Sequence, residues 1–268
     1  MDKAVILARG LGTRMRKQDG AAQLTAEQTR VAEQGIKALI PIDRPFLDYV
    51  LHALAEAGYK DVCLVIGPEH QVVRDYYGGL ECRRIRIHFG IQERPLGTAN
   101  AVLGAEEFAG KDPFLVINSD NYYPLSALRG LREINGPGLA GFEKQAMLDG
   151  GNIPADRIAK FAVIEADGKG RMSRIIEKPS AEVLASLPEP LLISMNCWRF
   201  NHTIFESCRS IAPSARGEYE IPDAVMYSID RLGQSYQVVV ARAPVLDMSS
   251  RSDVEGVAAK LKGTEISL

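Results

Sequence analysis

The sequence predicts an α/β fold, Rossmann-like, in which helices flank a mixed, mainly parallel twisted sheet. Apolar runs of strand length alternate with helical stretches through the first 120 residues, a pattern typical of parallel sheets covered on both faces. The first run, residues 4–8, breaks abruptly into a loop with two glycines. The fourth run, residues 114–120, is polar only at its C-terminal end. Because ligands bind at the carboxyl ends of strands in such sheets, we expect the functional site there.

Strands and helices of the first half follow from apolar runs and from helical periodicity. A further helix is expected after Asp48 as its N-cap, with Val50 and Leu54 facing the core and Gly58 ending it. The polar segment 18–35 reads as an insertion with a helical centre. The expected strands are 4–8, 62–67, 85–92 and 114–120, and the other helices are 25–33, 71–77 and 97–108.

The second half is less regular but shows the same kinds of element. Its last long helix has Pro222 in the first turn and Gly233 just past the end, as helix termini prefer. No linker of Pro, Gly and Ser divides the chain, so we expect one domain, residues 1–268. The expected strands are 139–143, 161–166, 172–177, 191–200 and 237–241, and the helices are 181–187, 203–211, 221–232 and 254–261.

Composition limits the classes of partner. With 46% hydrophobic and 25% charged residues, a chain of 268 residues can bury one large core. The net charge of −2 gives no general attraction to nucleic acid or to anionic membranes. No apolar run reaches membrane-spanning length, and Arg9, Arg14 and Arg16 interrupt any signal peptide. The four cysteines form no Cys-x-x-Cys pair. We expect a cytoplasmic protein without nucleic-acid or membrane partners.

The loop after the first strand reads Gly10-x-Gly12-Thr13-Arg14. Glycines there let the backbone turn sharply and bring its N–H groups close to an anion. A bare Gly-x-Gly is also common in ordinary tight turns. The dinucleotide fingerprint would need a third glycine where Met15 stands, and a Walker loop would need Gly-Lys-Ser/Thr. Arg14 instead supplies a permanently charged fork, which suits a triphosphate.

Seven short motifs occur in order along nearly the whole chain. They are Leu7-Ala8-x-Gly10-x-Gly12-Thr13-Arg14, Lys37-Ala38-Leu39-Ile40-Pro41-Ile42 with Arg44-Pro45, Gln92-x-x-x-x-Gly97-Thr98-Ala99, Asn118-Ser119-Asp120-Asn121, Glu177-Lys178-Pro179, Gly217-Glu218-Tyr219-Glu220-x-x-Asp223 and Leu246-Asp247. Together they resemble the sugar-phosphate nucleotidyltransferases, or NDP-sugar pyrophosphorylases, such as glucose-1-phosphate thymidylyl- and uridylyltransferases. The resemblance implies the nucleotide-diphospho-sugar transferase (GT-A) type of α/β fold.

The reaction implied by the resemblance is attack of a sugar 1-phosphate on the α-phosphorus of an NTP, with release of pyrophosphate. Such chemistry needs cations and backbone donors to align two anions, and no Ser or Cys nucleophile. Lys37 is a lone lysine in an apolar segment and is awkward to bury unpaired, which favours a functional role. By resemblance, the catalytic residues are Arg14, Lys37 and Asp120, and the nucleotide-binding residues are Leu7, Ala8, Gly10, Gly12, Thr13, Gln92, Gly97 and Thr98.

One amide favours a pyrimidine nucleotide. The resemblance assigns Gln92 and Gly97 to the edge of the base, and an amide fits the imide of uracil or thymine, so UTP or dTTP is favoured. Glucose 1-phosphate is favoured as acceptor by its frequency in the family alone. By resemblance, Glu177, Lys178, Asn196 and Ala162 bind the sugar phosphate, although Glu177 and Lys178 could equally form a surface ion pair.

Magnesium is the implied cofactor. Asp120 and Asp247 each follow an apolar run, and two carboxylates with substrate phosphates and waters make a typical Mg²⁺ shell. Each aspartate by itself could be an ordinary turn former. By resemblance, the two form the metal pair.

Several departures from the family pattern limit these expectations. Arg9 stands where Ala or Gly is usual and adds a cation beside the loop. The insertion 18–35 is a candidate lid or oligomer contact. Ala162 and Asn196 replace residues common near the sugar, which leaves the sugar open. The chain ends soon after the helix that follows Asp247, so no C-terminal β-helix domain is expected.

Other functions stay open at this point. The same chemistry could use CTP or GTP, or another phosphorylated acceptor. A non-catalytic regulatory subunit could keep the fold and bind sugar nucleotides. A dehydrogenase is disfavoured by Met15 in the place of the third glycine. The sequence does not decide the base, the sugar, the pathway or the oligomeric state, and a homo-oligomer is compatible with it.

Overall fold

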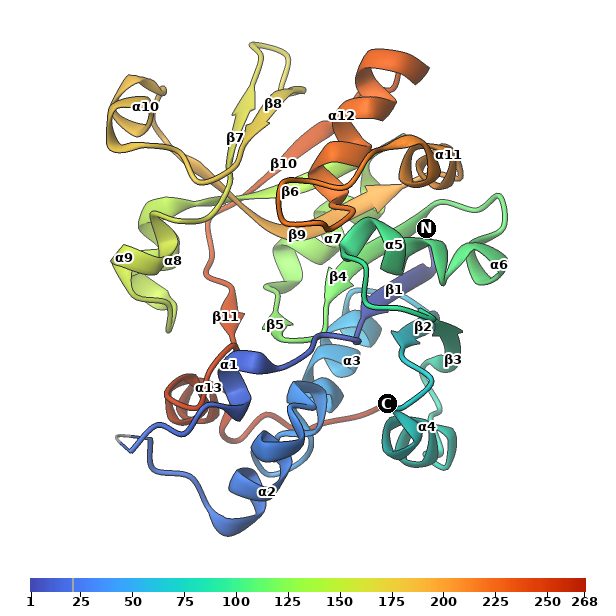
Figure 1. Cartoon of the computed structure of the whole chain (residues 1–268), viewed down its shortest axis with the longest axis vertical. Helices are drawn as coiled ribbons and strands as arrows, with labels where there is room; N and C mark the ends of the chain where they lie inside the picture. The colour runs from blue at the N-terminus through green and yellow to red at the C-terminus, as the bar shows by residue number, and fades with distance from the viewer. Residues whose placement is uncertain (21) are drawn as a thin grey trace.

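A nine-stranded mixed sheet forms the centre of the computed structural model, which describes residues 1–20 and 22–268 (Figure 1). The main path of the sheet runs in the order β10-β6-β9-β4-β1-β2-β3. The strands from β3 to β4 are parallel to one another, as expected from the alternation of strands and helices. These four are β1 (Lys3–Leu7), β2 (Asp61–Ile66), β3 (Arg86–Ile91) and β4 (Phe114–Asn118).

The second half of the chain makes the sheet mixed. Strand β9 is antiparallel to both of its neighbours, β4 and β6, and β10 is parallel to β6. A hairpin of β7 and β8 attaches to β9, and a separate pair, β5 with β11, forms a short antiparallel ladder. The predicted mixed, mainly parallel fold is confirmed. These strands are β5 (Asn121–Tyr122), β6 (Gly138–Glu143), β7 (Val163–Ala166), β8 (Met172–Ile176), β9 (Leu192–Phe200), β10 (Gln237–Ala241) and β11 (Leu246–Asp247).

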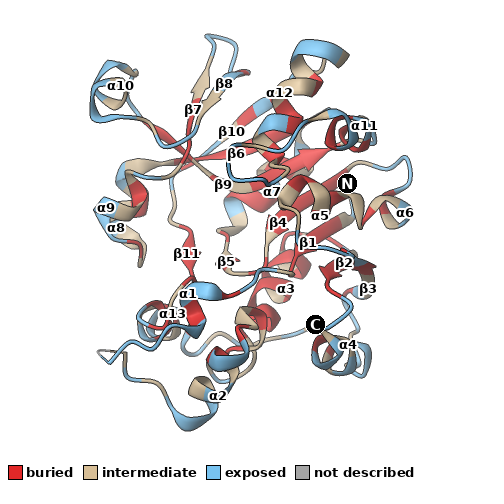
Figure 2. Ribbon diagram, in the orientation of Figure 1, coloured by how far each residue is buried: buried red, intermediate tan, exposed pale blue. Residues whose placement is uncertain are grey.

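Two hydrophobic clusters cover the two faces of the sheet, and β1 contributes to both. Ala4 and Ile6 belong to one cluster, and Val5 and Leu7 belong to the other, because successive side chains of a strand point to opposite faces. Figure 2 shows the central strands as the most buried part of the molecule, with exposure increasing outward over the helices. On the first face lie α3 (Phe46–Glu56), α4 (Gln71–Gly78), α7 (Leu125–Glu133) and α13 (Asp253–Leu261); on the second lie α5 (Thr98–Leu103), α11 (Thr203–Ser210) and α12 (Ile221–Leu232).

Two sequence-based expectations about helices are wrong. Asp48 does not cap α3, whose N-cap is Pro45; it lies inside the first turn, fully buried. Its carboxylate accepts hydrogen bonds from Arg44, Tyr76 and Tyr77, so a buried polar network, and not helix capping, explains this residue.

The second correction concerns residues 97–108, which form two short helices and not one. Helix α5 ends at Leu103, and α6 (Glu106–Ala109) begins after Gly104 and Ala105. Glycine is a poor helix former, and Gly104 packs directly on β3: a Cβ added at Gly90 would lie 2.3 Å from the Gly104 carbonyl oxygen. The close approach of two glycines thus accompanies the break.

The helical centre of the insertion is confirmed. Helix α2 (Ala26–Gln34) begins with a capping box between Thr25 and Gln28 and ends at Gly35 in the left-handed conformation. One residue of the insertion, Ala21, lies outside the described residues. Elements that the sequence did not reveal include α7, β5 and β11, together with α1 (Thr13–Arg16), a 3-10 turn η1 (Lys37–Leu39), α8 (Lys144–Gly150) and α9 (Ala155–Ile158); the predicted helix near residue 181 is α10 (Ala181–Ser186).

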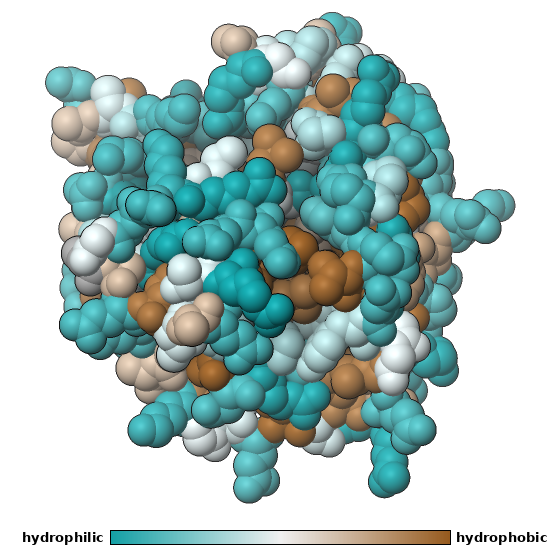
Figure 3. Space-filling model, turned by 60° about the horizontal axis from the view of Figure 1, so that its bottom comes forward, coloured by the Kyte–Doolittle hydropathy of each residue, from teal (hydrophilic) through white to brown (hydrophobic). Residues whose placement is uncertain are grey.

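The surface of the described residues carries few large apolar side chains. Leu11, Val72, Ile91 and Val240 are the exposed ones among them, and they come from separate parts of the chain. On the face shown in Figure 3, apolar side chains gather in small groups separated by hydrophilic ones. None of the helices found in residues 1–20 and 22–268 has the length and apolar character needed to cross a membrane.

Candidate active site

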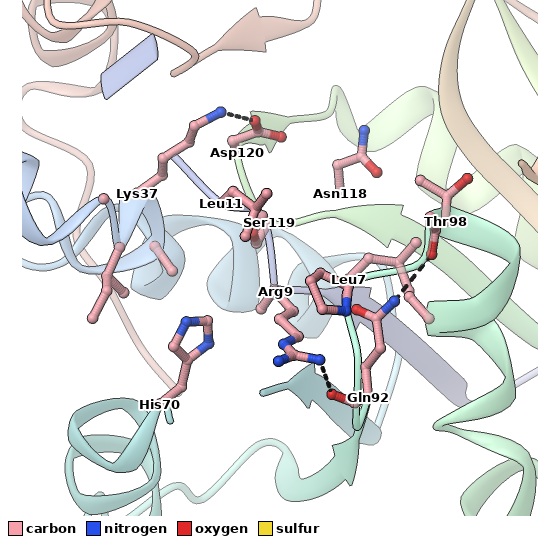
Figure 4. Close-up of a pocket in the computed structure, with 18 of the residues that line it drawn as sticks. Leu7, Arg9, Leu11, Lys37, His70, Gln92, Thr98, Asn118, Ser119 and Asp120 are labelled. Atoms are coloured by element: carbon pink, nitrogen blue, oxygen red, sulfur yellow. Dashed lines mark hydrogen bonds and ion pairs between the residues drawn. The ribbon is translucent and has the colours of Figure 1, made fainter. Parts of the chain in front are cut away.

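A cleft of about 360 Å³ opens beside the carboxyl ends of β1, β3 and β4 (Figure 4), a volume within the range usual for ligand sites. Helix α5 and the turn η1 complete its walls. Most of the predicted catalytic and nucleotide-binding residues line this one cleft: Leu7, Ala8, Gly10, Thr13, Lys37, Gln92, Gly97, Thr98 and Asp120. The structure thus brings together residues that are up to 113 positions apart (120 − 7) in the chain.

The two glycines of the loop after β1 have different structural requirements. Gly12 has φ +60°, and a Cβ there would lie 2.1 Å from the carbonyl oxygen of Gly35, so both its backbone and its packing demand glycine. Gly10 lines the cleft and has no atom within 4 Å of an added Cβ. The space at Gly10 is therefore open to a ligand, whereas Gly12 shapes the loop.

Lys37 and Asp120 form an ion pair inside the cleft, as the dashed line in Figure 4 shows. The Lys37 Nζ lies 2.7 Å from the Asp120 Oδ2, and the two side chains are 13% and 22% exposed. Lys37 is carried by η1 and Asp120 follows β4 directly. The apolar segment around Lys37 is thus compatible with burial because the ammonium has a partner.

Asp247 lies on β11, beside the chain that carries Asp120. In this ladder Asp247 pairs with Asn121, and the Met248 N–H donates to the Asp120 carbonyl oxygen at 2.8 Å. Burial, and next the negative charge of Asp120, raise the pKa of Asp247 to about 6. The two predicted metal ligands are therefore neighbours, although Asp247 itself does not line the cleft.

The carboxylate of Asp247 is held by three donors. The Asn121 Nδ2 and the Ser249 Oγ donate to its Oδ1 at 3.1 Å and 2.7 Å, and Arg157 of α9 pairs with its Oδ2. Arg157 also pairs with Asp253 at 3.0 Å. These contacts fix the orientation of Asp247 before any ligand arrives.

The donor set suits a hard cation. Asp120 and Asp247 offer only oxygen, and burial, followed by the charge of Asp120, disfavours the ionised form of Asp247, so a bound cation would be stabilising here. Within the part of the chain that the structure describes, no three side chains of His, Cys, Asp or Glu converge on a common point. The pair fits Mg²⁺ whose remaining ligands are phosphate oxygens and water.

Gln92 is 5% exposed and is fixed at the end of β3. Its Nε2 donates to the Gly97 carbonyl oxygen and to the Asn100 Oδ1, both at 3.0 Å. These bonds use both hydrogens of the amide nitrogen and leave its oxygen as the available group. Gly97 has φ +112°, and a Cβ there would lie 2.4 Å from the Tyr219 carbonyl oxygen, so both its backbone and its packing demand glycine.

The predicted sugar-phosphate residues cluster away from the lining of this cleft. The register of β7 and β8, in which Val163 pairs with Ile176, places Ala162 next to Glu177. The Ser194 N–H donates to the Ala162 carbonyl oxygen at 2.8 Å, two residues before Asn196. Tyr123, whose hydroxyl contacts both Asn121 and the Asn196 carbonyl oxygen, joins this cluster to the Asp120–Asp247 ladder.

Backbone strain marks the same cluster. Among the described residues, the non-glycine positions with positive φ are Lys178 (44°) and Asn196 (52°). Such conformations cost free energy and concentrate at functional sites. Burial, and next the charge of Glu220, raise the pKa of Glu177, so carboxylates crowd here beside the cations Lys178 and Arg216.

Arg14 lies on the exposed side of α1 and does not line the cleft, although Thr13 does. No hydrogen bond or ion pair of its guanidinium is found within residues 1–20 and 22–268. Its assignment to the triphosphate stays a prediction.

Several lining residues were not assigned from the sequence. Asn118, Ser119 and Glu218 lie within motifs that had been recognised, so their place in those motifs was an available signal. His70 lines the cleft and Arg157 holds Asp247, and neither carried a sequence signal. Arg9 also lines the cleft.

Comparison with known proteins defines the class of this chain. Residues 3–243 match the sequence model of the nucleotidyl transferase family, and the chain belongs to that family. It is 30% identical over 229 residues to the glucose-1-phosphate thymidylyltransferase of Streptomyces griseus, covering 85% of this chain and 57% of that protein.

A second relative and one solved structure complete the comparison. The bifunctional protein GlmU of Methanococcus vannielii is 30% identical over 228 residues, covering 85% of this chain and 47% of that protein. The chain thus spans about half the length of these curated relatives. A crystal structure of UDP-glucose pyrophosphorylase complexed with UDP-glucose superposes with a TM-score of 0.74 at 19% identity, covering 97% of this chain and 98% of that chain, which supports the fold.

Proposed function

We propose that this protein transfers a nucleoside monophosphate from UTP or dTTP to a sugar 1-phosphate, with glucose 1-phosphate favoured, and releases pyrophosphate. The observation that carries the proposal is the single cleft that contains the glycine loop, the Lys37–Asp120 pair and Gln92. Its relatives include a protein named glucose-1-phosphate thymidylyltransferase.

The residues of the cleft suit phosphoryl transfer without a protein nucleophile. An oxygen of the sugar 1-phosphate attacks the α-phosphorus, the bond from that phosphorus to the α–β bridging oxygen breaks, and pyrophosphate leaves with the electron pair. Backbone N–H groups around Gly10 and the ammonium of Lys37 hold phosphate oxygens and reduce the repulsion between the two anions. Arg14, on the exposed side of α1, adds a cation for the triphosphate.

Gln92 supports selection of a pyrimidine with an N–H at position 3. Because its Nε2 is bound to Gly97 and Asn100, its Oε1 is available to accept a hydrogen bond from N3–H of uracil or thymine. Cytosine has an unprotonated N3 and would leave two acceptors facing each other. The discrimination expected for a mismatched buried polar pair is about 1–3 kcal/mol, or about 5- to 150-fold.

Mg²⁺ is proposed as the cofactor, with Asp120 and Asp247 as its protein ligands. When bound, the cation would neutralise charge on the triphosphate and on the developing transition state. The sugar 1-phosphate is assigned to Ala162, Glu177, Lys178 and Asn196, a cluster supported by the strained backbone of Lys178 and Asn196. A cytoplasmic location, a single domain and the absence of nucleic-acid and membrane partners stay predictions from the sequence.

The experiment is a pyrophosphate-release assay with Mg²⁺, glucose 1-phosphate and each NTP in turn. We expect release with UTP or dTTP, and at least about tenfold lower kcat/KM with CTP. Release with CTP or GTP at equal efficiency would contradict the base assignment. No release with any NTP, together with measurable binding of UDP-glucose, would favour the non-catalytic regulatory subunit. Release only with other sugar phosphates would change the acceptor.

A further inference from the structure

Arg9 follows β1, and each of its three guanidinium nitrogens donates to a protein acceptor. Its Nε and Nη2 donate to the two carboxylate oxygens of Glu69 at 3.0 Å and 3.1 Å, and its Nη1 donates to the Gln92 carbonyl oxygen. The side chain of Arg9 is 9% exposed, whereas that of Glu69 is 51% exposed. Arg9 lies at the wall of the cleft, and Figure 4 shows its guanidinium directed at Gln92.

Gly67 allows this pair to lie close to the sheet. A Cβ added at Gly67 would lie 2.4 Å from the Arg9 Nε and 2.3 Å from a carboxylate oxygen of Glu69. Gly67 is absent from the glycines with positive φ, so its backbone does not itself require glycine. A side chain at Gly67 would instead displace the Arg9 and Glu69 side chains from their present positions.

The arrangement joins the ends of three adjacent strands. Arg9 follows β1, Gly67 and Glu69 follow β2, and Gln92 follows β3. Bidentate pairing fixes the plane of a guanidinium more strictly than a single contact does. We name Arg9, Gly67 and Glu69 the strand-end clamp.

The contacts of the strand-end clamp argue against the expectation that Arg9 serves as an extra cation for phosphate. Glu69 balances its charge, and the hydrogen bond from Arg9 lowers the pKa of Glu69, so the pair is ionised across the neutral range. All three guanidinium nitrogens already have protein acceptors. What Arg9 acts on is Gln92, whose carbonyl it holds from one side while Gly97 and Asn100 hold the amide from the other.

We propose that Arg9 is a positioning residue that determines base specificity, because the strand-end clamp fixes the backbone of Gln92 so that the amide presents its oxygen to the base. The inference rests on the proposed function and explains how this chain would hold Gln92 for selection of the base. A side chain fixed at both its backbone and its amide loses little entropy on binding, so it discriminates more sharply than a mobile one.

The test compares Arg9→Ala and Glu69→Gln with the wild type in steady-state assays with UTP, dTTP and CTP, and in calorimetric titration with UTP without sugar. For Arg9→Ala we expect KM for the preferred NTP to rise at least tenfold, kcat to change less than threefold, and the preference over CTP to fall at least tenfold. Glu69→Gln should also raise KM for the preferred NTP and reduce the preference over CTP, but by smaller factors than Arg9→Ala. The double variant should be within twofold of Arg9→Ala, because the two residues act as one unit.

A matched control is available in the same sheet. Arg86 makes a bidentate pair with Asp61 at 2.7 Å for both bonds, at the opposite ends of β2 and β3. Arg86→Ala should leave KM and base preference unchanged. Arg9→Lys keeps the charge but has no fork, and it should behave like Arg9→Ala.

The outcomes separate the two proposals. A wild-type protein that turns over no NTP refutes the proposed function itself. A selective wild type with unchanged KM and base preference in Arg9→Ala refutes the inference alone. A fall in kcat at constant KM and preference in Arg9→Ala also refutes it, since that pattern belongs to a phosphate contact. If Arg9→Ala does not fold, as judged by thermal melting, Glu69→Gln decides by the same criteria.

Discussion

Lys37→Met tests whether the ion pair in the cleft serves the reaction more than the fold. The Lys37 Nζ and the Asp120 Oδ2 are 2.7 Å apart, and solvent reaches both side chains only in part, at 13% and 22% exposure. The substitution keeps most of the apolar stem, so it removes the charge with little loss of packing.

The expected magnitudes follow from this geometry. Removing one partner of a fully buried pair costs about 3–5 kcal/mol, and an exposed pair contributes about 0–1 kcal/mol. For a pair with this intermediate exposure we expect the free energy of unfolding to fall by about 1–3 kcal/mol. Loss of a cation that stabilises charge on phosphoryl oxygens should lower kcat/KM by about 10²–10³-fold.

The assay combines pyrophosphate release, with UTP or dTTP and glucose 1-phosphate, and urea unfolding of the same preparations. Lys160→Met is the matched control, because Lys160 pairs with Asp156 at 3.4 Å with both side chains more than 70% exposed. The control should keep its activity and lose less than about 0.5 kcal/mol of stability. Activity of Lys37→Met within threefold of the wild type would refute the catalytic assignment. A stability loss no larger than that of the control would refute the reasoning from burial.

Three further predictions concern the loop and the acidic pair. Gly12→Ala should destabilise the fold by at least about 2 kcal/mol because φ is +60° and its Cβ would lie 2.1 Å from the Gly35 carbonyl oxygen. Gly10→Ala should melt at the wild-type temperature in calorimetry but raise KM for the NTP. Equal stability of the two variants would contradict the different roles assigned to Gly10 and Gly12. Asp120→Ala and Asp247→Ala should each lower turnover at least about 10²-fold while circular dichroism stays native, and a near-wild-type rate in either would remove it from the metal pair. The pKa of Asp247 is raised from 3.8 to about 6, so its ionisation destabilises the metal-free fold; this penalty is fully present above pH 6 and is relieved as pH falls toward 4. The Mn²⁺ affinity, measured by electron paramagnetic resonance, should therefore weaken about tenfold from pH 7 to pH 5. A Mn²⁺ affinity that does not change over this range would contradict the titration of Asp247.

The strands near the site could be predicted from the sequence because their information is local. Residues 4–8 and 114–120 are apolar runs bounded by glycine or polar residues, and such composition reports burial without reference to the rest of the chain. The helix in the insertion, expected at residues 25–33, was readable for the same reason, whereas its capping box at Thr25 was found in the structure. The motifs likewise gave the family, which the comparison confirms.

The helices of the less regular half show where local information is insufficient. Helices α8 and α9 are short and were not predicted, yet α9 supplies Arg157 to Asp247. In the first half, the helix expected at 97–108 is divided where Gly104 packs on Gly90 of a neighbouring strand. Each of these features depends on a contact with another element, and tertiary contacts override local propensity.

By itself, the sequence determined the class of fold, the glycine loop and the family, since these depend on periodicity and on motifs within short segments. Only the tertiary structure decided which charges meet: Lys37 with Asp120, 83 positions away, Arg9 with Glu69, and Asp247 beside the chain of Asp120. The physical reason is that the order and direction of the strands in the sheet set the distances between their ends. Electrostatic interaction depends on those distances, and spacing along the chain does not reveal them.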